Sequence, residues 1–135
     1  MAKFIEFDLD TITSNLDKYC KEAIYTHYSE IKLIKVSEYV GHDGYDREGP
    51  QSNLFDLSVL YCSQGNYYLD QWHREDWFCL KEPEPYSLFA RYRLEESLVE
   101  KLVNSTDNKI EVSNNNSILV NSIYEKHSKP FIKPI

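Results

Sequence analysis

The sequence predicts an α+β fold, with a mostly antiparallel sheet of about five to six strands and two helices packed on one face. Runs of β-branched and aromatic residues are separated by short turn sequences, as in hairpins, whereas two other stretches repeat apolar residues at helical spacing. Strands and helices do not alternate regularly, so a parallel sheet is not expected. No repeat or change in composition divides the 135 residues, which are expected to form a single domain, 1–135.

The first forty residues are expected to form a strand, a helix and a second strand. Residues 3–7 (KFIEF) are β-like, and Asp8 or Asp10 can then cap the start of a helix. The helix is predicted over about 11–27, because apolar residues recur there every three or four positions. Those residues are Ile12, Leu16, Cys20, Ala23 and Ile24, and His27 can extend the same face. Residues 31–40 (IKLIKVSEYV) are β-branched and apolar, which favours a strand.

The middle of the chain is expected to contain an exposed loop and a hairpin. Residues 41–53 collect glycine, proline, aspartate and asparagine, which favours a long loop. Apolar and polar residues then alternate on both sides of the sequence SQGN, so a hairpin is predicted over 54–73. Gly65 in that turn can adopt a positive φ angle.

The C-terminal part is expected to add a strand, a helix and a second hairpin. One long helix from 86 to 103 would place two glutamates on its buried face, which is costly. A strand at 87–93 and a separate helix at 94–104 are therefore favoured. Two further strand-like runs, 109–113 and 116–126, flank asparagines that tolerate turn conformations.

The net charge of −7 results from 22 acidic and 15 basic side chains. An acidic surface repels phosphate groups, so direct binding to nucleic acid or to an anionic membrane is not expected. A partner attracted by this charge would be a basic protein. A charge of this size also has a simpler explanation, because it keeps a small domain soluble without any partner.

The three cysteines, Cys20, Cys62 and Cys79, are odd in number, far apart and set among apolar or aromatic neighbours. This pattern predicts reduced and mostly buried thiols in a cytoplasmic protein. The first ten residues lack the apolar run of a signal peptide, and no stretch is apolar over the length of a membrane span. Cysteine and histidine spacings typical of zinc sites do not occur, so neither a metal nor another cofactor is expected.

Two histidine clusters are candidates for chemistry. His42, Asp43 and Asp46 lie in the predicted loop, where a histidine and two carboxylates can bind a divalent metal or act as acid and base. His73 is preceded by Asp70 and followed by Glu75 and Asp76, and these carboxylates could orient its imidazole and raise its pKa. Neither cluster has a specific catalytic spacing, and no nucleophile motif or phosphate-binding glycine loop occurs, so no catalytic residue is predicted.

The stretch YYLDQWHREDWF, residues 67–78, concentrates aromatic rings and carboxylates. Alternation along a strand places an aromatic residue on each face, so the stretch is either covered on both sides or exposed as a binding patch. Arg74 could pair with Asp70 or with Asp76 inside the stretch. The residues predicted to contact a partner are Tyr68, Asp70, Trp72, Glu75, Asp76 and Trp77, together with Asp43 and Asp46 of the loop.

These features favour a small acidic binding or inhibitor protein that docks on a basic protein, such as a nuclease, and blocks its active site. In type, though not by any motif, the chain resembles immunity proteins that neutralise nuclease toxins and phage-borne anti-defence inhibitors. Two alternatives remain open: a metal-assisted hydrolase that uses either histidine cluster, and a protein that sequesters a small molecule in an aromatic pocket. An exposed aromatic strand could also support a homodimer.

Overall fold

The structure is a computed structural model that describes residues 4–43, 52–77, 85–106 and 117–122. Only the backbone is described for His42, Asp43, Trp77 and residues 117–122. Within the described ranges no helix has the length and apolar character needed to cross a membrane.

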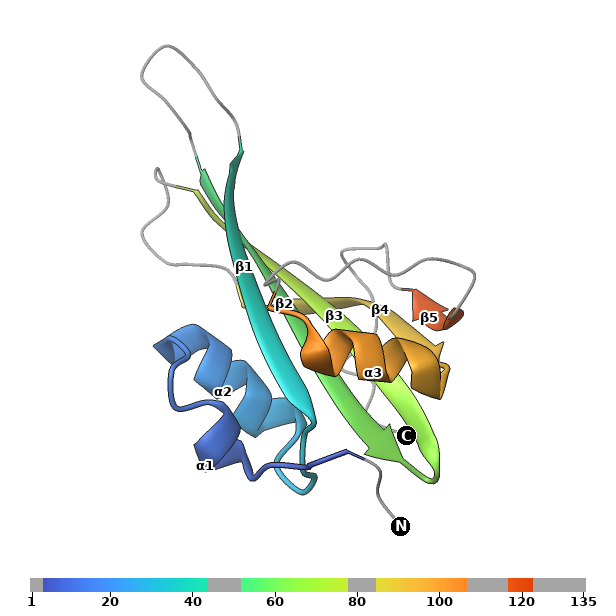
Figure 1. Cartoon of the computed structure of the whole chain (residues 1–135). Coiled ribbons are helices and arrows are strands. Elements are labelled where there is room, and N and C mark those ends of the chain that lie inside the picture. Colours follow the sequence, from blue (N-terminus) through green and yellow to red (C-terminus); the bar gives the residue numbers. More distant parts are fainter. Residues whose placement is uncertain (1–3, 44–51, 78–84, 107–116, 123–135) are drawn as a thin grey trace.

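One antiparallel sheet organises the chain, and its strands follow one another in sequence order. The strands are β1 (Lys35–Asp43), β2 (Ser52–Ser63), β3 (Asn66–Trp77), β4 (Ser87–Leu94) and β5 (Ser117–Ser122). Figure 1 shows β2 and β3 as the long central hairpin of this sheet. The predicted α+β class with an antiparallel sheet is confirmed.

The predicted central hairpin is also confirmed, and it is longer than expected. Its tight turn uses Gln64 and Gly65, whose φ angles are both positive, at 53° and 81°. Two consecutive positive φ angles produce the twist that suits a two-residue connection between antiparallel strands. At the other end, part of the predicted loop is strand, because Asp43 pairs with Ser52 and Ser52 pairs with Trp77.

The predicted helix over 11–27 is wrong in extent, because two helices occupy this region: α1 (Leu9–Ile12) and α2 (Lys18–His27). The Thr13 hydroxyl donates a hydrogen bond of 2.6 Å to the Leu9 carbonyl at the end of α1. Asp17 then caps α2, since its carboxylate accepts a hydrogen bond of 2.9 Å from the Cys20 amide. The upstream β-like run contributes one isolated bridge, between Phe7 and Leu33.

The helices do not share one face of the sheet, which corrects the predicted arrangement. Cys20 and Ile24 of α2 pack with Leu57 and Val59 of β2, whereas α3 (Glu96–Asn104) packs against Leu60. Neighbouring residues of a strand point to opposite faces, so α2 and α3 cover opposite sides. In Figure 1, β1 runs between α2 and α3.

Lys35 at the start of β1 fixes the end of α3. Its ammonium group donates hydrogen bonds of 2.6 Å to the Leu102 carbonyl and 2.8 Å to the Ser105 carbonyl. These carbonyls lie at the C-terminal end of the helix, where backbone acceptors lack helical partners and a cation is favoured.

The strand predicted at 87–93 corresponds closely to β4, but its pairing with β3 is irregular. Gln71 pairs with Ala90 and the next residue, Trp72, pairs with Leu88. One extra β4 residue, Phe89, is therefore inserted between the two pairs, as in a β-bulge. Because of this offset, Leu88 and Arg91 both belong to the α2 side of the sheet although they are three residues apart.

A buried ion pair lies on the α2 side, at the centre of the sheet. The Asp70 carboxylate accepts hydrogen bonds from Arg91 Nε at 2.7 Å and Arg91 Nη2 at 2.9 Å. It also accepts hydrogen bonds from the hydroxyls of Tyr28, at 2.6 Å, and Tyr61, at 3.1 Å. Trp72 Nε1 donates in turn to the Tyr28 hydroxyl at 2.8 Å. The network joins the end of α2 to strands β2, β3 and β4.

In this buried network the two tyrosines are neutral, while Asp70 and Arg91 form a charged pair. Burial and the nearby Asp70 carboxylate raise the pKa values of Tyr28 and Tyr61, so both phenols stay protonated and act as donors. A carboxylate with four donors, two of them from one bidentate arginine, has the geometry that a buried pair requires to offset the cost of leaving water.

Replacing Arg91 with methionine should lower the free energy of unfolding by about 3–5 kcal/mol, because Asp70 would remain buried without its cation. Arg93→Met is the matched control, since Arg93 is an exposed arginine of the same strand, and should change stability by less than about 0.5 kcal/mol. Urea unfolding monitored by circular dichroism measures both. Equal effects of the two substitutions would contradict a structural role for the pair.

Candidate functional site

Three residues predicted to contact a partner are buried, which corrects their assignment. Tyr68 is 5% exposed, Asp70 0% and Trp72 2%. All three point toward α2, because they alternate along β3 on the side that the helix covers. Their aromatic rings and carboxylate build the core and the ion-pair network, so they cannot reach a docked protein.

Four of the five remaining predicted contacts lie toward one end of the sheet. Glu75 and Asp76 are half-buried, and each has a partner: Ser52 donates to Glu75 at 2.9 Å, and Arg74 donates to Asp76 at 2.6 Å. Asp43 and Trp77 occupy strand ends at which only the backbone is described. Asp46 lies outside the described residues. Partner contact through these positions stays a prediction.

The predicted cluster around His73 is divided between the two faces of β3. His73 Nδ1 lies 2.8 Å from a carboxylate oxygen of Asp56 on β2, while Asp70 points to the opposite face. Glu75 is bonded to Ser52 and Asp76 to Arg74, so neither is the partner of the imidazole. The expected pairing of Arg74 with Asp76 is confirmed. Chemistry by His42, Asp43 and Asp46 stays a prediction, because their side chains are not described.

The outer side of α1 and α2 combines exposed tyrosines with carboxylates. Tyr19 is 40% and Tyr25 is 41% exposed, and the Tyr25 hydroxyl donates to the Asp10 carboxylate. Between residues 4 and 30 the chain has six carboxylates and two lysines, a net charge of −4 out of −7 for the whole chain. We name this surface the α2 face, defined by Asp10, Asp17, Tyr19, Glu22 and Tyr25.

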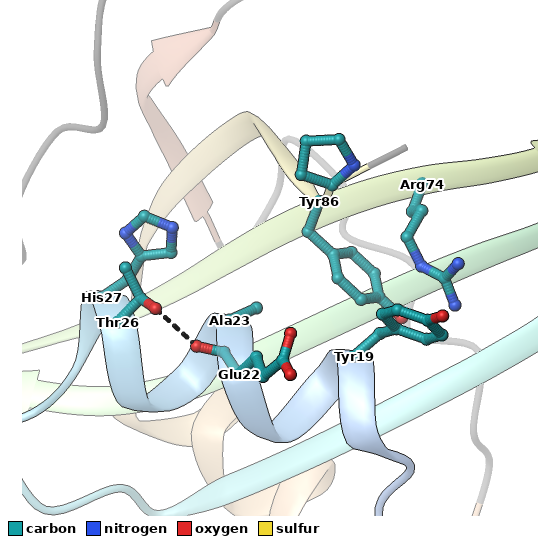
Figure 2. Close-up of a pocket in the computed structure, with 8 residues that line it drawn as sticks. Tyr19, Glu22, Ala23, Thr26, His27, Arg74 and Tyr86 are labelled. Atoms are coloured by element: carbon teal, nitrogen blue, oxygen red, sulfur yellow. Dashed lines mark hydrogen bonds between the residues drawn. The ribbon is translucent and has the colours of Figure 1, made fainter. Parts of the chain in front are cut away.

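A pocket of about 350 Å³ opens beside the α2 face. Helical spacing places one row of α2 side chains along it, opposite the segment that enters β4. Figure 2 shows Tyr86 and Arg74 on the side of the pocket across from the helix. The lining residues are Tyr19, Glu22, Ala23, Thr26, His27, Arg74, Pro85 and Tyr86.

Arg74 is enclosed by aromatic rings at one end of this pocket. Its guanidinium carbon lies 4.0 Å from the ring centroid of Phe55, 4.6 Å from that of Tyr19 and 5.2 Å from that of Tyr86. Only 1% of its side chain is exposed. Aromatic faces attract a guanidinium, but they do not accept its in-plane N–H groups.

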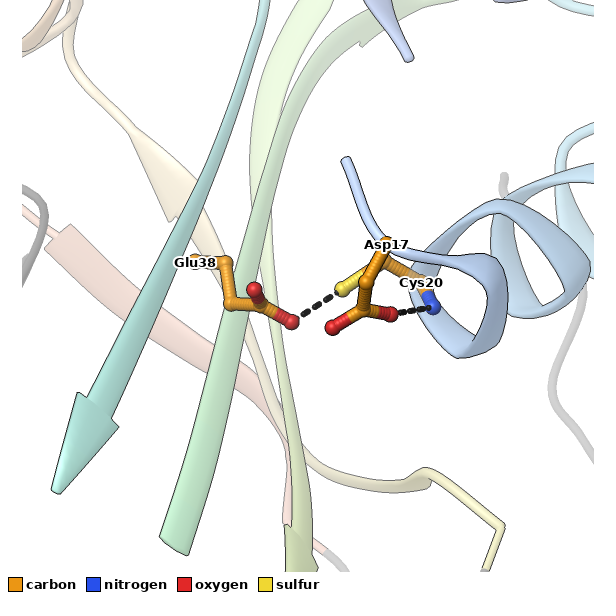
Figure 3. Close-up of side chains that lie close together, drawn as sticks. All are labelled: Asp17, Cys20 and Glu38. Carbon is orange, nitrogen blue, oxygen red and sulfur yellow. Dashed lines mark hydrogen bonds between the residues drawn. The ribbon is translucent and has the colours of Figure 1, made fainter. Parts of the chain in front are cut away.

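A thiol and a carboxylate lie beneath the pocket, between α2 and β1 (Figure 3). Cys20 Sγ donates to the Glu38 carboxylate and lies 3.1 Å from the Tyr86 hydroxyl, which itself donates to Glu38 at 2.8 Å. Burial, and secondly the hydrogen bond to Glu38, raise the pKa of Cys20. The group is therefore a neutral thiol that stabilises a half-buried carboxylate.

Among the described residues, this cluster also has the side-chain types and the spacing of a possible metal site. Ligand atoms of Asp17, Cys20 and Glu38 lie within 4.8 Å of one another. Metal ligation requires a thiolate. Cys20 is held protonated here, and Asp17 already accepts the Cys20 amide at the start of α2. The arrangement fits a structural hydrogen-bond cluster better than a metal centre.

His27 stacks on the buried Trp72, with ring centroids 4.6 Å apart and an interplanar angle of 19°. Burial lowers the pKa of His27, so its imidazole is neutral at physiological pH. A neutral ring adds no charge to the pocket that it lines.

No family model matches the chain, and no curated protein and no solved structure matches it either.

Sequence reasoning missed the α2 face and the pocket. The signal for the face was present, because Tyr19, Glu22 and Tyr25 fall outside the apolar stripe of Cys20 and Ile24. The pocket could not be found in this way, because Arg74 of β3 and Tyr86, the residue before β4, come together only through the pairing of these two strands.

Cys20 should resist alkylation by iodoacetamide at about pH 8 in the native protein, because only the thiolate reacts. The half-buried Cys62 should react faster, and both thiols should react at similar rates in urea. Peptide mapping by mass spectrometry measures the modified fraction. Native labelling of Cys20 at its urea rate would show that the thiol is neither buried nor protonated as described.

His27 should make the protein less stable as the pH falls. Its folded pKa lies below the unfolded value near 6.5, so the unfolded chain binds more protons in the interval between the two values. Stability is therefore retained above about pH 6.5 and decreases below it. His27→Gln should lose less stability than the original protein between about pH 7.5 and 5.5 in urea unfolding. An identical pH dependence of the two proteins would contradict this role.

Proposed function

We propose that the protein is a small acidic binding protein that docks on a basic protein partner through the α2 face and blocks that partner's active site. The supporting observation is that two exposed tyrosines belong to a segment, residues 4–30, whose net charge is −4. Rigid aromatic rings bury much area at a small cost in entropy, and surrounding carboxylates attract and orient a cationic surface.

The proposed mechanism is steric and electrostatic. A partner that acts on nucleic acid has a positively charged active site, which an acidic helix face complements. Docked there, the α2 face occupies the position of the polyanionic substrate. Inhibition of this kind needs no catalytic residue, in agreement with the proposed assignment to a toxin-immunity or anti-defence type of inhibitor in the cytoplasm.

The α2 face replaces the β3 stretch as the proposed contact surface, because the described aromatic and acidic residues of β3 are buried or paired. Glu22 lies near the middle of the exposed arc of the helix, between the directions of Tyr19 and Tyr25. A charge reversal at Glu22 should therefore repel a basic partner without disturbing the core.

Affinity capture from cells of the source organism tests the proposal with three baits: the original protein, Glu22→Lys and Glu100→Lys. Glu100 is an exposed glutamate of α3, on the opposite face of the sheet, and serves as the matched control. We expect one basic protein to be retained by the original and the Glu100 variant, and to bind at least about tenfold more weakly to the Glu22 variant.

Two further measurements make the outcome decisive. Calorimetry with the purified partner should show an affinity that decreases as ionic strength increases, and the complex should inhibit the partner's activity on its substrate. A salt-independent affinity, equal losses for both variants, or a captured protein that remains fully active would refute docking through the α2 face.

A further inference from the structure

Arg74 contains the one buried side-chain nitrogen or oxygen atom that lacks a hydrogen-bond partner among the described residues. That atom is Nε, while Nη1 donates to Asp76. Buried polar atoms are nearly always paired, and leaving a charged donor unpaired is costly. An unpaired guanidinium nitrogen on a residue that lines a pocket is the arrangement expected when an acceptor from outside the chain completes the site.

We propose that this pocket binds a small molecule that carries one carboxylate and one amino group, the chemical class of the free α-amino acids. The carboxylate accepts hydrogen bonds from the Nε edge of Arg74. A planar carboxylate matches a guanidinium edge better than other acceptors do, and the rings of Phe55, Tyr19 and Tyr86 around the guanidinium do not accept its in-plane N–H groups.

Glu22 provides the complementary charge for the amino group. Its carboxylate lines the pocket and is exposed, and Figure 2 shows it on the helix side, across from Tyr86. On this wall the Thr26 hydroxyl already donates to the Glu22 carbonyl at 2.7 Å, and the His27 ring stacks on Trp72. The pocket lining thus contains one cation, Arg74, and one anion, Glu22, together with apolar surface from Ala23 and Pro85.

The size of the pocket agrees with this ligand class. A volume of about 350 Å³ lies at the small end of ligand pockets and suits a molecule of amino-acid size. The ring faces of Tyr19 and Tyr86 favour an apolar or aromatic side chain on the ligand.

Access to Arg74 depends on Tyr19. The Tyr86 ring is fixed by hydrogen bonds with Glu38 and Cys20, whereas the Tyr19 ring is 40% exposed at the helix surface. A change of the Tyr19 side chain to another rotamer would take its ring away from the guanidinium and open a path to it without moving the backbone. Tyr19 therefore acts as the movable cover of the site.

Matched ligands test the proposal on the unmodified protein, independently of any protein partner. Phenylalanine and leucine are titrated in a two-dimensional NMR experiment, each beside the analogue that lacks its carboxylate and the analogue that lacks its amino group. For phenylalanine these are phenethylamine and 3-phenylpropionate. We expect saturable shifts around α2 with the amino acid, and at least about tenfold weaker binding of both analogues.

Two variants then assign the contacts. Arg74→Lys keeps the charge but loses the Nε edge, and should weaken phenylalanine binding at least about tenfold. Glu22→Gln changes an exposed residue and should fold normally, so it tests the site even if Arg74→Lys does not fold. It should weaken the binding of phenylalanine but not the binding of 3-phenylpropionate. Glu100→Gln on α3 should leave both affinities unchanged.

Several outcomes would overturn the site. One is the absence of binding by any of the protein amino acids at millimolar concentration. A second is equal affinity for phenylalanine and either analogue, which would show that the site does not recognise the charged group that this analogue lacks. A third is unchanged affinity in the Glu22 variant, which would remove the proposed contact with the amino group. Failure of the α2 face to bind a partner has no bearing on these measurements, because they use the protein alone.

Discussion

The contact between Asp70 and Arg91 determines how the rest of the molecule is assembled. Two full charges lie at the centre of the sheet, out of water, and they are tolerated because every direction around the carboxylate has a donor. Those donors come from the end of α2, from β2 and from β4. The network can therefore form only when the helix, the hairpin and β4 are all in their native positions. Apolar packing alone allows such elements to slide, whereas a buried pair specifies one alignment.

The position of α2 follows from this alignment, and both proposed sites depend on it. Tyr28 anchors the C-terminal end of the helix in the network, and Asp17 begins the helix at the other end. Between them, Cys20 and Ile24 face the sheet, so Tyr19, Glu22 and Tyr25 must face outward or toward the pocket. The side chains that α2 presents to solvent are thus determined by the packing and hydrogen bonding of the core.

Local patterns in the sequence were sufficient for the elements but not for their arrangement. The turn at Gly65, the strand before α3 and α3 itself follow from residue types within a few positions. The break before α2 was missed because a helix-like apolar spacing continues across it, and the break depends on the cap formed by Asp17. The burial of Asp70 was missed because its cation, Arg91, lies on another strand, and sequence alone does not bring these residues together.

The extra residue in β4 determines where the length of this strand can change during evolution. Removing Phe89 would leave Leu88 and Arg91 two positions apart, so both would stay on the α2 side with regular pairing to β3. A deletion beyond the bulge has a different effect. Leu94 packs on the α3 side, and removing Tyr92 would rotate it to the opposite face. Related chains should therefore gain or lose a residue at the bulge more readily than elsewhere in β4.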